Sequence, residues 1–146
     1  MGMKIDLETG VLTINEKYQI KPLMTLEEIK SSNLTELMSE QSKDTLKNRP
    51  SAPIFLSCMV DGEEVSIELD ILDELIGIYI KVDSAGMAEC YYNDDEMKFN
   101  DIVSKNRRFM AELFKDSDNN RDGFKWGEAS FNNGSRTYNA YIEIEY

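Results

Sequence analysis

Apolar and polar residues alternate along much of the chain, which predicts strands with one buried face and one solvent face. The alternating segments cover residues 3–7, 11–14, 18–20, 54–60, 65–71, 76–82, 124–131 and 138–146. Turn residues separate several of them, at 8–10, 61–62 and 132–134. Because the connections are short, we expect hairpins and a meander, and therefore antiparallel pairing.

Two other segments show helical spacing. Thr25-Leu26-Glu27-Glu28 fits a capping box, and apolar residues continue on roughly one face as far as Met38. Between 97 and 114, apolar residues recur at steps of three, four and seven. The polar stretch 40–53 predicts a connection.

These elements predict one domain over residues 1–146 of the α+β class. We expect a single-layer antiparallel sheet with two helices packed on one face. The length and the 41% of hydrophobic residues suit a globular domain with its own core. The predicted core contains Ile29, Val65, Ile67, Ile78, Ile80, Ile102, Met110, Leu113 and Ile142.

The negative charge is concentrated in the middle of the chain. The formal net charge is -12, and residues 51–100 hold twelve acidic but only two basic residues. These residues include the strongest strand pattern, so the charge is expected on a sheet face or rim. Such a field repels nucleic acid and anionic membranes and attracts a basic protein or a cation. We therefore expect a basic protein partner, with no nucleic acid and no membrane.

Eight residues form the predicted partner-binding set. They are Glu64, Glu68, Asp70, Tyr79, Tyr91, Tyr92, Asp94 and Asp95. The first three share the solvent face of one strand, and Tyr79 lies on the next strand. The other four form an acidic rim with tyrosines, which are frequent interface anchors. The alternative interpretation is that the tyrosines cover sheet edges, that Trp126 packs in the core, and that the acids only solvate the surface.

Most catalytic devices are missing. The chain has no histidine, two isolated cysteines and no glycine-rich phosphate loop. We therefore expect a protein that is not an enzyme and has no cofactor, with a small enzyme that uses carboxylates as an alternative. Cysteine usage and the lack of a leader predict a cytoplasmic protein, and residues 1–2 look like an addition before a native Met3.

One loop partly matches a calcium motif. Residues 118–123 satisfy the D-x-[DN]-x-[DN]-G opening of an EF-hand loop, with Asp118, Asn120 and Asp122 as candidate ligands. The twelfth position should be a bidentate Glu and is Ala129. We expect either a polar turn between a helix and a strand or a weak cation site, with no affinity for calcium tighter than about millimolar.

The layout of the whole chain resembles the small acidic immunity and inhibitor proteins that bacteria make against protein toxins. The resemblance includes the ending, from Gly123-Phe124-Lys125-Trp126-Gly127 to Tyr141-Ile142-Glu143-Ile144-Glu145-Tyr146. It implies a protein that neutralises a nuclease or similar toxin, and it carries over no functional residue. The alternatives are a purely structural domain, a weak calcium module and a small enzyme. The sequence leaves the oligomeric state open.

Overall fold

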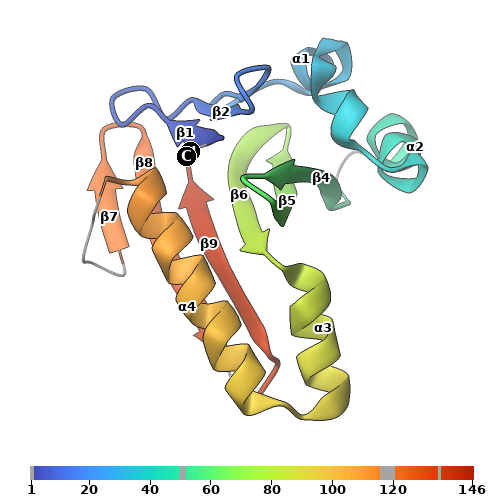
Figure 1. The fold of residues 1–146 in the computed structure, drawn as a ribbon. Coiled ribbons are helices and arrows are strands. Elements are labelled where there is room, and N and C mark those ends of the chain that lie inside the picture. The colour runs from blue at the N-terminus through green and yellow to red at the C-terminus, as the bar shows by residue number, and fades with distance from the viewer. Residues whose placement is uncertain (1, 50–51, 116–120, 135) are drawn as a thin grey trace.

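A computed structural model describes residues 2–49, 52–115, 121–134 and 136–146, which form two antiparallel sheets with helices (Figure 1). The elements in chain order are β1 (Met3–Ile5), β2 (Leu12–Ile14), β3 (Tyr18–Ile20), α1 (Leu26–Ser31), the 3-10 helix η1 (Asn33–Leu37), α2 (Glu40–Asn48), β4 (Ile54–Val60), β5 (Glu63–Leu72), β6 (Glu74–Val82), α3 (Ser84–Asn93), α4 (Glu96–Leu113), β7 (Arg121–Phe124), β8 (Gly127–Gly134) and β9 (Asn139–Glu145). The α+β class and the antiparallel pairing are confirmed. The single-layer sheet with two helices is wrong, because the described residues form a second sheet and four α-helices.

The main sheet has six strands in the order β4-β5-β6-β9-β8-β7. The strands β4, β5 and β6 form the predicted meander, with Leu56 opposite Ile67 and Ile67 opposite Ile80. The last strand, β9, pairs with β6 on one side and with β8 on the other. The last strand of the chain therefore lies between two strands that come earlier in the sequence.

One face of this sheet is buried and the other is open to solvent. Helix α4 contacts β6, β8 and β9 on the buried face, and α3 packs beside α4 (Figure 1). All nine residues of the predicted core are buried. The burial follows directly from the period of two in the strands and the apolar stripe of the long helix.

The N-terminal strands form a separate three-stranded sheet, because β1 and β3 pair only with β2 among the described strands. Side chains from distant parts of the chain hold this sheet in place. The Trp126 indole N–H donates to the Leu7 carbonyl at 2.9 Å, and the Tyr146 hydroxyl donates to the Gly10 carbonyl at 3.2 Å. Trp126 also stacks on Phe124, so it serves the packing of the two sheets.

Two helices lack a strong apolar stripe, and the sequence pattern missed both. Helix α2 lies in the stretch predicted as a connection, and its buried residues are Ser42, Thr45 and Leu46. Helix α3 buries Gly86, Met87 and Cys90 and leaves Tyr91 and Tyr92 exposed. Capping defines these helices better than hydrophobicity does: the Asp83 carboxylate accepts from the Gly86 N–H at the start of α3.

The C-terminal hairpins differ from the prediction in their turns. The stretch 124–131, predicted as one strand, is split by a turn at Lys125–Trp126, with Phe124 opposite Gly127. At Gly127 φ is 155°, and a Cβ there would lie 1.9 Å from the Glu145 carbonyl oxygen, so only glycine fits. Residues 132–134, predicted as a turn, are the end of β8.

Candidate protein-binding surface

The solvent face of the main sheet, called the open face below, carries acidic and aromatic side chains. Strand pairing brings Glu68 of β5 opposite Tyr79 of β6, and Tyr79 opposite Glu143 of β9. The open face comprises Phe55, Ser57 and Met59 of β4, Glu64, Ser66, Glu68 and Asp70 of β5, Tyr79 and Lys81 of β6, Glu128, Ser130 and Asn132 of β8, and Asn139, Tyr141, Glu143 and Glu145 of β9.

The structure thus brings four residues of the predicted set, Glu64, Glu68, Asp70 and Tyr79, onto one surface. It adds three acids that the prediction omitted, namely Glu128, Glu143 and Glu145. The alternation in 138–146 puts the last two on a solvent face, but only the position of β9 beside β6 places them next to the acids of β5. The ion pairs between described residues include none of Glu64, Glu68, Asp70, Glu143 and Glu145.

Crowding of negative charge changes the ionisation of this face. The hydrogen bond with Glu143, and then its charge, raise the pKa of Glu145. Partial burial raises the pKa of Glu68, with Lys81 opposing the rise and Asp70 adding to it. Burial and the carboxylates around it also raise the pKa of Tyr79. Like charge therefore opposes the ionisation of Glu145, whereas burial is the main cause of the raised pKa at Glu68 and Tyr79.

Replacing Glu145 by glutamine is expected to stabilise the protein at neutral pH. A raised pKa in the folded state means that folding favours the protonated acid. Its contribution to stability is therefore present below the unfolded pKa of about 4.3 and is lost as the pH rises through the folded value. Glu145 is largely exposed and screened by solvent, so the gain at about pH 7 should not exceed about 1 kcal/mol.

Urea denaturation of Glu145→Gln at about pH 7 and about pH 4 measures this effect, with Glu112→Gln on the exposed side of α4 as the matched control. The gain should shrink at the lower pH for Glu145→Gln. A loss of stability at neutral pH would show that Glu145 is not repelled by its neighbours.

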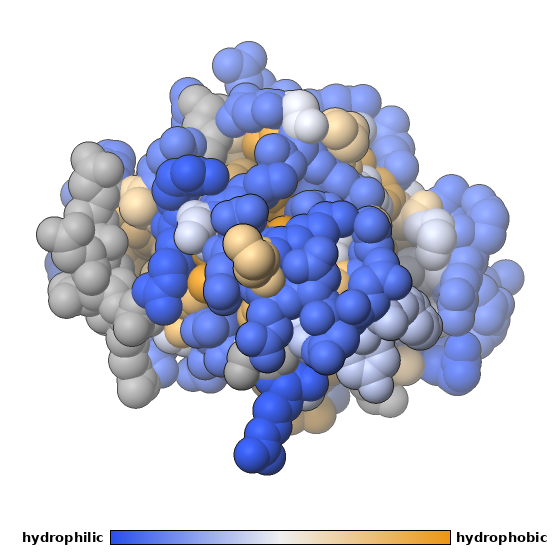
Figure 2. Space-filling model, turned by 60° about the horizontal axis from the view of Figure 1, so that its bottom comes forward, coloured by the Kyte–Doolittle hydropathy of each residue, from blue (hydrophilic) through white to orange (hydrophobic). Residues whose placement is uncertain are grey.

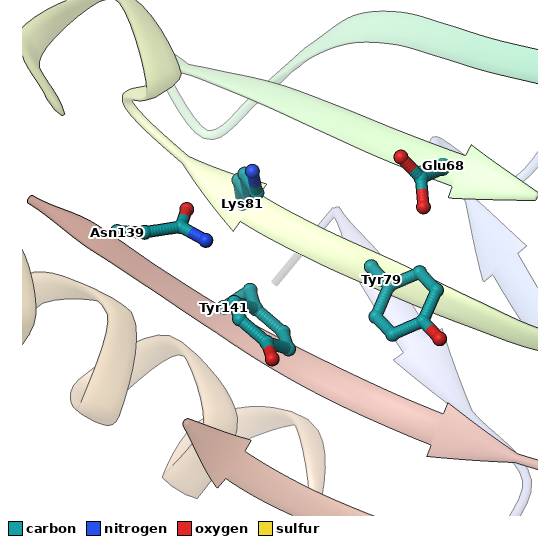
Figure 3. Close-up of a pocket in the computed structure, with 5 residues that line it drawn as sticks. All are labelled: Glu68, Tyr79, Lys81, Asn139 and Tyr141. Carbon is teal, nitrogen blue, oxygen red and sulfur yellow. The ribbon is translucent and has the colours of Figure 1, made fainter. Parts of the chain in front are cut away.

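A shallow hollow of about 310 Å³ lies in the centre of the open face. Its lining side chains are Glu68, Tyr79, Lys81, Asn139 and Tyr141, from three neighbouring strands (Figure 3). The two tyrosine rings meet edge to face, with centroids 5.7 Å apart. Aromatic rings beside a carboxylate can receive a cationic side chain of another protein.

A second hollow, of about 320 Å³, adjoins the first, since Lys81 and Asn139 line both. Tyr91 and Tyr92 of α3 also line this second hollow. They are 60% and 84% exposed, so both can contact a partner. The tertiary structure therefore joins the two tyrosines to the open face, although they lie on a helix and not at a sheet edge.

Asp94 and Asp95, the last two residues of the predicted set, cap the ends of two helices. Asp94 caps the C-terminus of α3, and its carboxylate accepts a hydrogen bond from the Tyr138 hydroxyl. This bond raises the pKa of Tyr138 to about 12. Asp95 caps the N-terminus of α4, where its carboxylate accepts from the Lys98 N–H at 3.0 Å. Both acids cap helix ends at the turn that joins α3, the helix that carries the tyrosines, to α4.

The outer edge of β4, one of the two edges of the main sheet, is occupied by other parts of the chain. The Phe55 N–H donates to Ser42 Oγ at 3.2 Å, and Asn15 Nδ2 donates to the Met59 carbonyl at 3.0 Å. Met38 forms a further bridge with Leu56. A partner strand therefore cannot simply add to this edge.

Figure 2 views the end of the molecule that lies at the bottom of Figure 1, where α3 and α4 meet. Hydrophilic residues cover most of this surface, and hydrophobic residues form only small separate groups on it. Among the described residues, this view therefore shows no broad hydrophobic patch at that end of the molecule.

The candidate calcium ligands lie outside the described part of the chain. This holds for Asp118 and Asn120 and for the side chain of Asp122, so the weak cation site stays a prediction. Within the described residues, no three acidic or cysteine side chains are arranged to hold a metal ion. No helix in that same part of the chain is long and apolar enough to cross a membrane.

Comparisons with protein-family models, with curated proteins and with solved structures find no match to this chain. The interpretation of the open face therefore rests on its own geometry and charge.

Proposed function

We propose that this chain is a non-enzymatic binding domain whose open face holds a basic protein. One observation carries the proposal: a solvent face on which acids from β5, β8 and β9 lie beside a tyrosine-lined hollow. Tyrosines supply contact area at low entropic cost, and the surrounding acids supply the charge that selects the partner.

The raised pKa of Glu145 supports a cationic partner, because the hydrogen bond with Glu143 and then its charge cause the rise. The two carboxylates repel each other when the protein is alone. Lysine or arginine side chains of a partner would offset that repulsion, so the unfavourable charge of the free protein becomes favourable on binding. The same charge disfavours nucleic acid and anionic membranes as ligands.

A toxin with a basic active surface fits this chemistry, and the resemblance of the chain's layout to immunity proteins supports it. A nuclease must attract phosphate and therefore presents cations. An acidic domain that covers those cations would block substrate entry. The proposal includes a cytoplasmic location, where such a domain protects the cell that makes the toxin.

Reversing Glu68 and Asp70 to lysine is expected to weaken binding about tenfold or more and to flatten its salt dependence. Affinity capture from the native host, followed by mass spectrometry, supplies the partner, and calorimetry at two salt concentrations measures the effect. The thermal midpoint should stay nearly unchanged, because neither side chain lies in the core.

The matched control reverses Asp101 and Glu112, two exposed acids on α4, and so changes the net charge equally. It should leave affinity nearly intact. Equal weakening by both double variants would reduce the effect to net charge alone. Unchanged affinity of the Glu68 and Asp70 variant would exclude the open face as the binding surface.

A further inference from the structure

The hollow in the open face is small and has both an aromatic wall and a charged wall. Its volume of about 310 Å³ is at the lower limit of ligand pockets, about 300–1,000 Å³, which suits a single side chain better than a folded segment. Tyr79 and Tyr141 form the aromatic wall, and Glu68 supplies the carboxylate (Figure 3).

The chain's own lysine already places a cation in the hollow. Lys81 Nζ lies 6.0 Å from the centroid of the Tyr141 ring, at the outer limit of a cation–π contact. Its charge also opposes the rise in the pKa of Glu68. Three acids remain around Lys81: burial raises the pKa of Tyr79 most, and the charges of Glu143, Asp70 and Glu68 add to the rise.

Arginine and lysine differ in how well they fit the side chains that line this hollow. A guanidinium group is planar and weakly hydrated, so it can lie on a tyrosine ring while it donates two hydrogen bonds to one carboxylate. The Asn139 amide oxygen offers a further acceptor in the same hollow. An ammonium group is a compact, strongly hydrated charge and gains less from the ring.

We infer that this hollow receives an arginine side chain of the partner, which stacks on Tyr141, pairs with Glu68 and displaces Lys81. The inference rests on the proposed function, in which the open face binds a basic protein, and it names the anchor of that contact. The adjoining hollow with Tyr91 and Tyr92 then takes the surface of the partner next to this arginine.

Titration of the isotope-labelled protein with N-acetyl-arginine amide and N-acetyl-lysine amide tests the inference by NMR. The arginine probe should shift the amide resonances of Tyr79, Lys81 and Tyr141 at concentrations about two- to fivefold lower than the lysine probe does, the factor expected of an exposed cation–π contact. Equal half-saturation by the two probes, or shifts spread over all exposed acids, would overturn it.

Two variants and one control sharpen the result. Tyr141→Leu should abolish the preference for arginine, whereas Phe55→Leu, which removes an aromatic ring of the open face outside the hollow, should retain it. Lys81→Met should strengthen arginine binding because the competing cation is gone. Weaker arginine binding by Lys81→Met contradicts the inference even if Tyr141→Leu does not fold.

The two proposals fail in different ways. If the Glu68 and Asp70 reversal weakens partner binding while the arginine probe shows no preference, the open face binds the partner without an arginine anchor. If the reversal leaves partner binding unchanged, the proposed function itself fails, whatever the probe shows.

Discussion

Replacing Ile67 by alanine is expected to lower the free energy of unfolding by about 2–5 kcal/mol, the range for truncating a buried aliphatic side chain. Ile67 is fully buried in β5, between Leu56 of β4 and Ile80 of β6. Strand neighbours on both sides prevent the sheet from collapsing into the space left behind. Leu113→Ala, near the end of α4, should cost a similar amount because that side chain is also buried.

Urea denaturation measures both losses, and Ser66→Ala is the matched control. Ser66 is the neighbour of Ile67 in β5 and lies on the open face, so its truncation should change stability by less than about 0.5 kcal/mol. Losses under about 0.5 kcal/mol at both Ile67 and Leu113 would mean that the faces of the sheet and the helix are wrongly assigned.

Replacing Asn106 by alanine is expected to cost about 2–5 kcal/mol, because it leaves two buried backbone groups without a partner. Asn106 is fully buried in α4. Its Oδ1 accepts from the Val82 N–H at 2.9 Å, and its Nδ2 donates to the Val82 carbonyl at 3.0 Å. The side chain thus acts as a strand partner for the last residue of β6, at the position where that strand gives way to α3.

Asn100→Ala, on the exposed side of the same helix, is the control for Asn106. Both changes replace asparagine by a better helix former, so the difference between them measures what the buried Asn106 side chain adds, chiefly its hydrogen bonds to Val82. Chemical denaturation at one pH gives that difference directly. Equal stability of the two variants would show that water or a backbone shift satisfies Val82 in place of Asn106.

The period of the apolar residues was enough to predict the core and part of the candidate surface. In β5 the alternation of Val65, Ile67 and Leu69 with acids determines which side faces solvent, because successive side chains of a strand point to opposite faces. The long helix and the Thr25 capping box followed from equally local rules. Each of these features depends only on residues close together in the chain.

The spacing of apolar residues failed to predict the short helices that bury few apolar side chains. Helices α2 and α3 bury few apolar side chains, so their sequences resemble loops, and capping by Ser39 and Asp83 had to be recognised instead. The three-residue strands of the N-terminal sheet were predicted, but not their separation from the main sheet. The pattern of a strand predicts which of its faces is buried but not which strand lies beside it.

By itself, the sequence determined the α+β class, the antiparallel hairpins, the core positions and the acidic solvent face of β5, since these follow from side-chain period and local charge. Only the tertiary structure decided that β9 lies between β6 and β8. That single pairing brings Tyr141 and Glu143 beside Tyr79 and forms the central hollow. Backbone hydrogen bonds are the same for every strand, so the choice of neighbour depends on the packing of the whole core, which no local pattern contains.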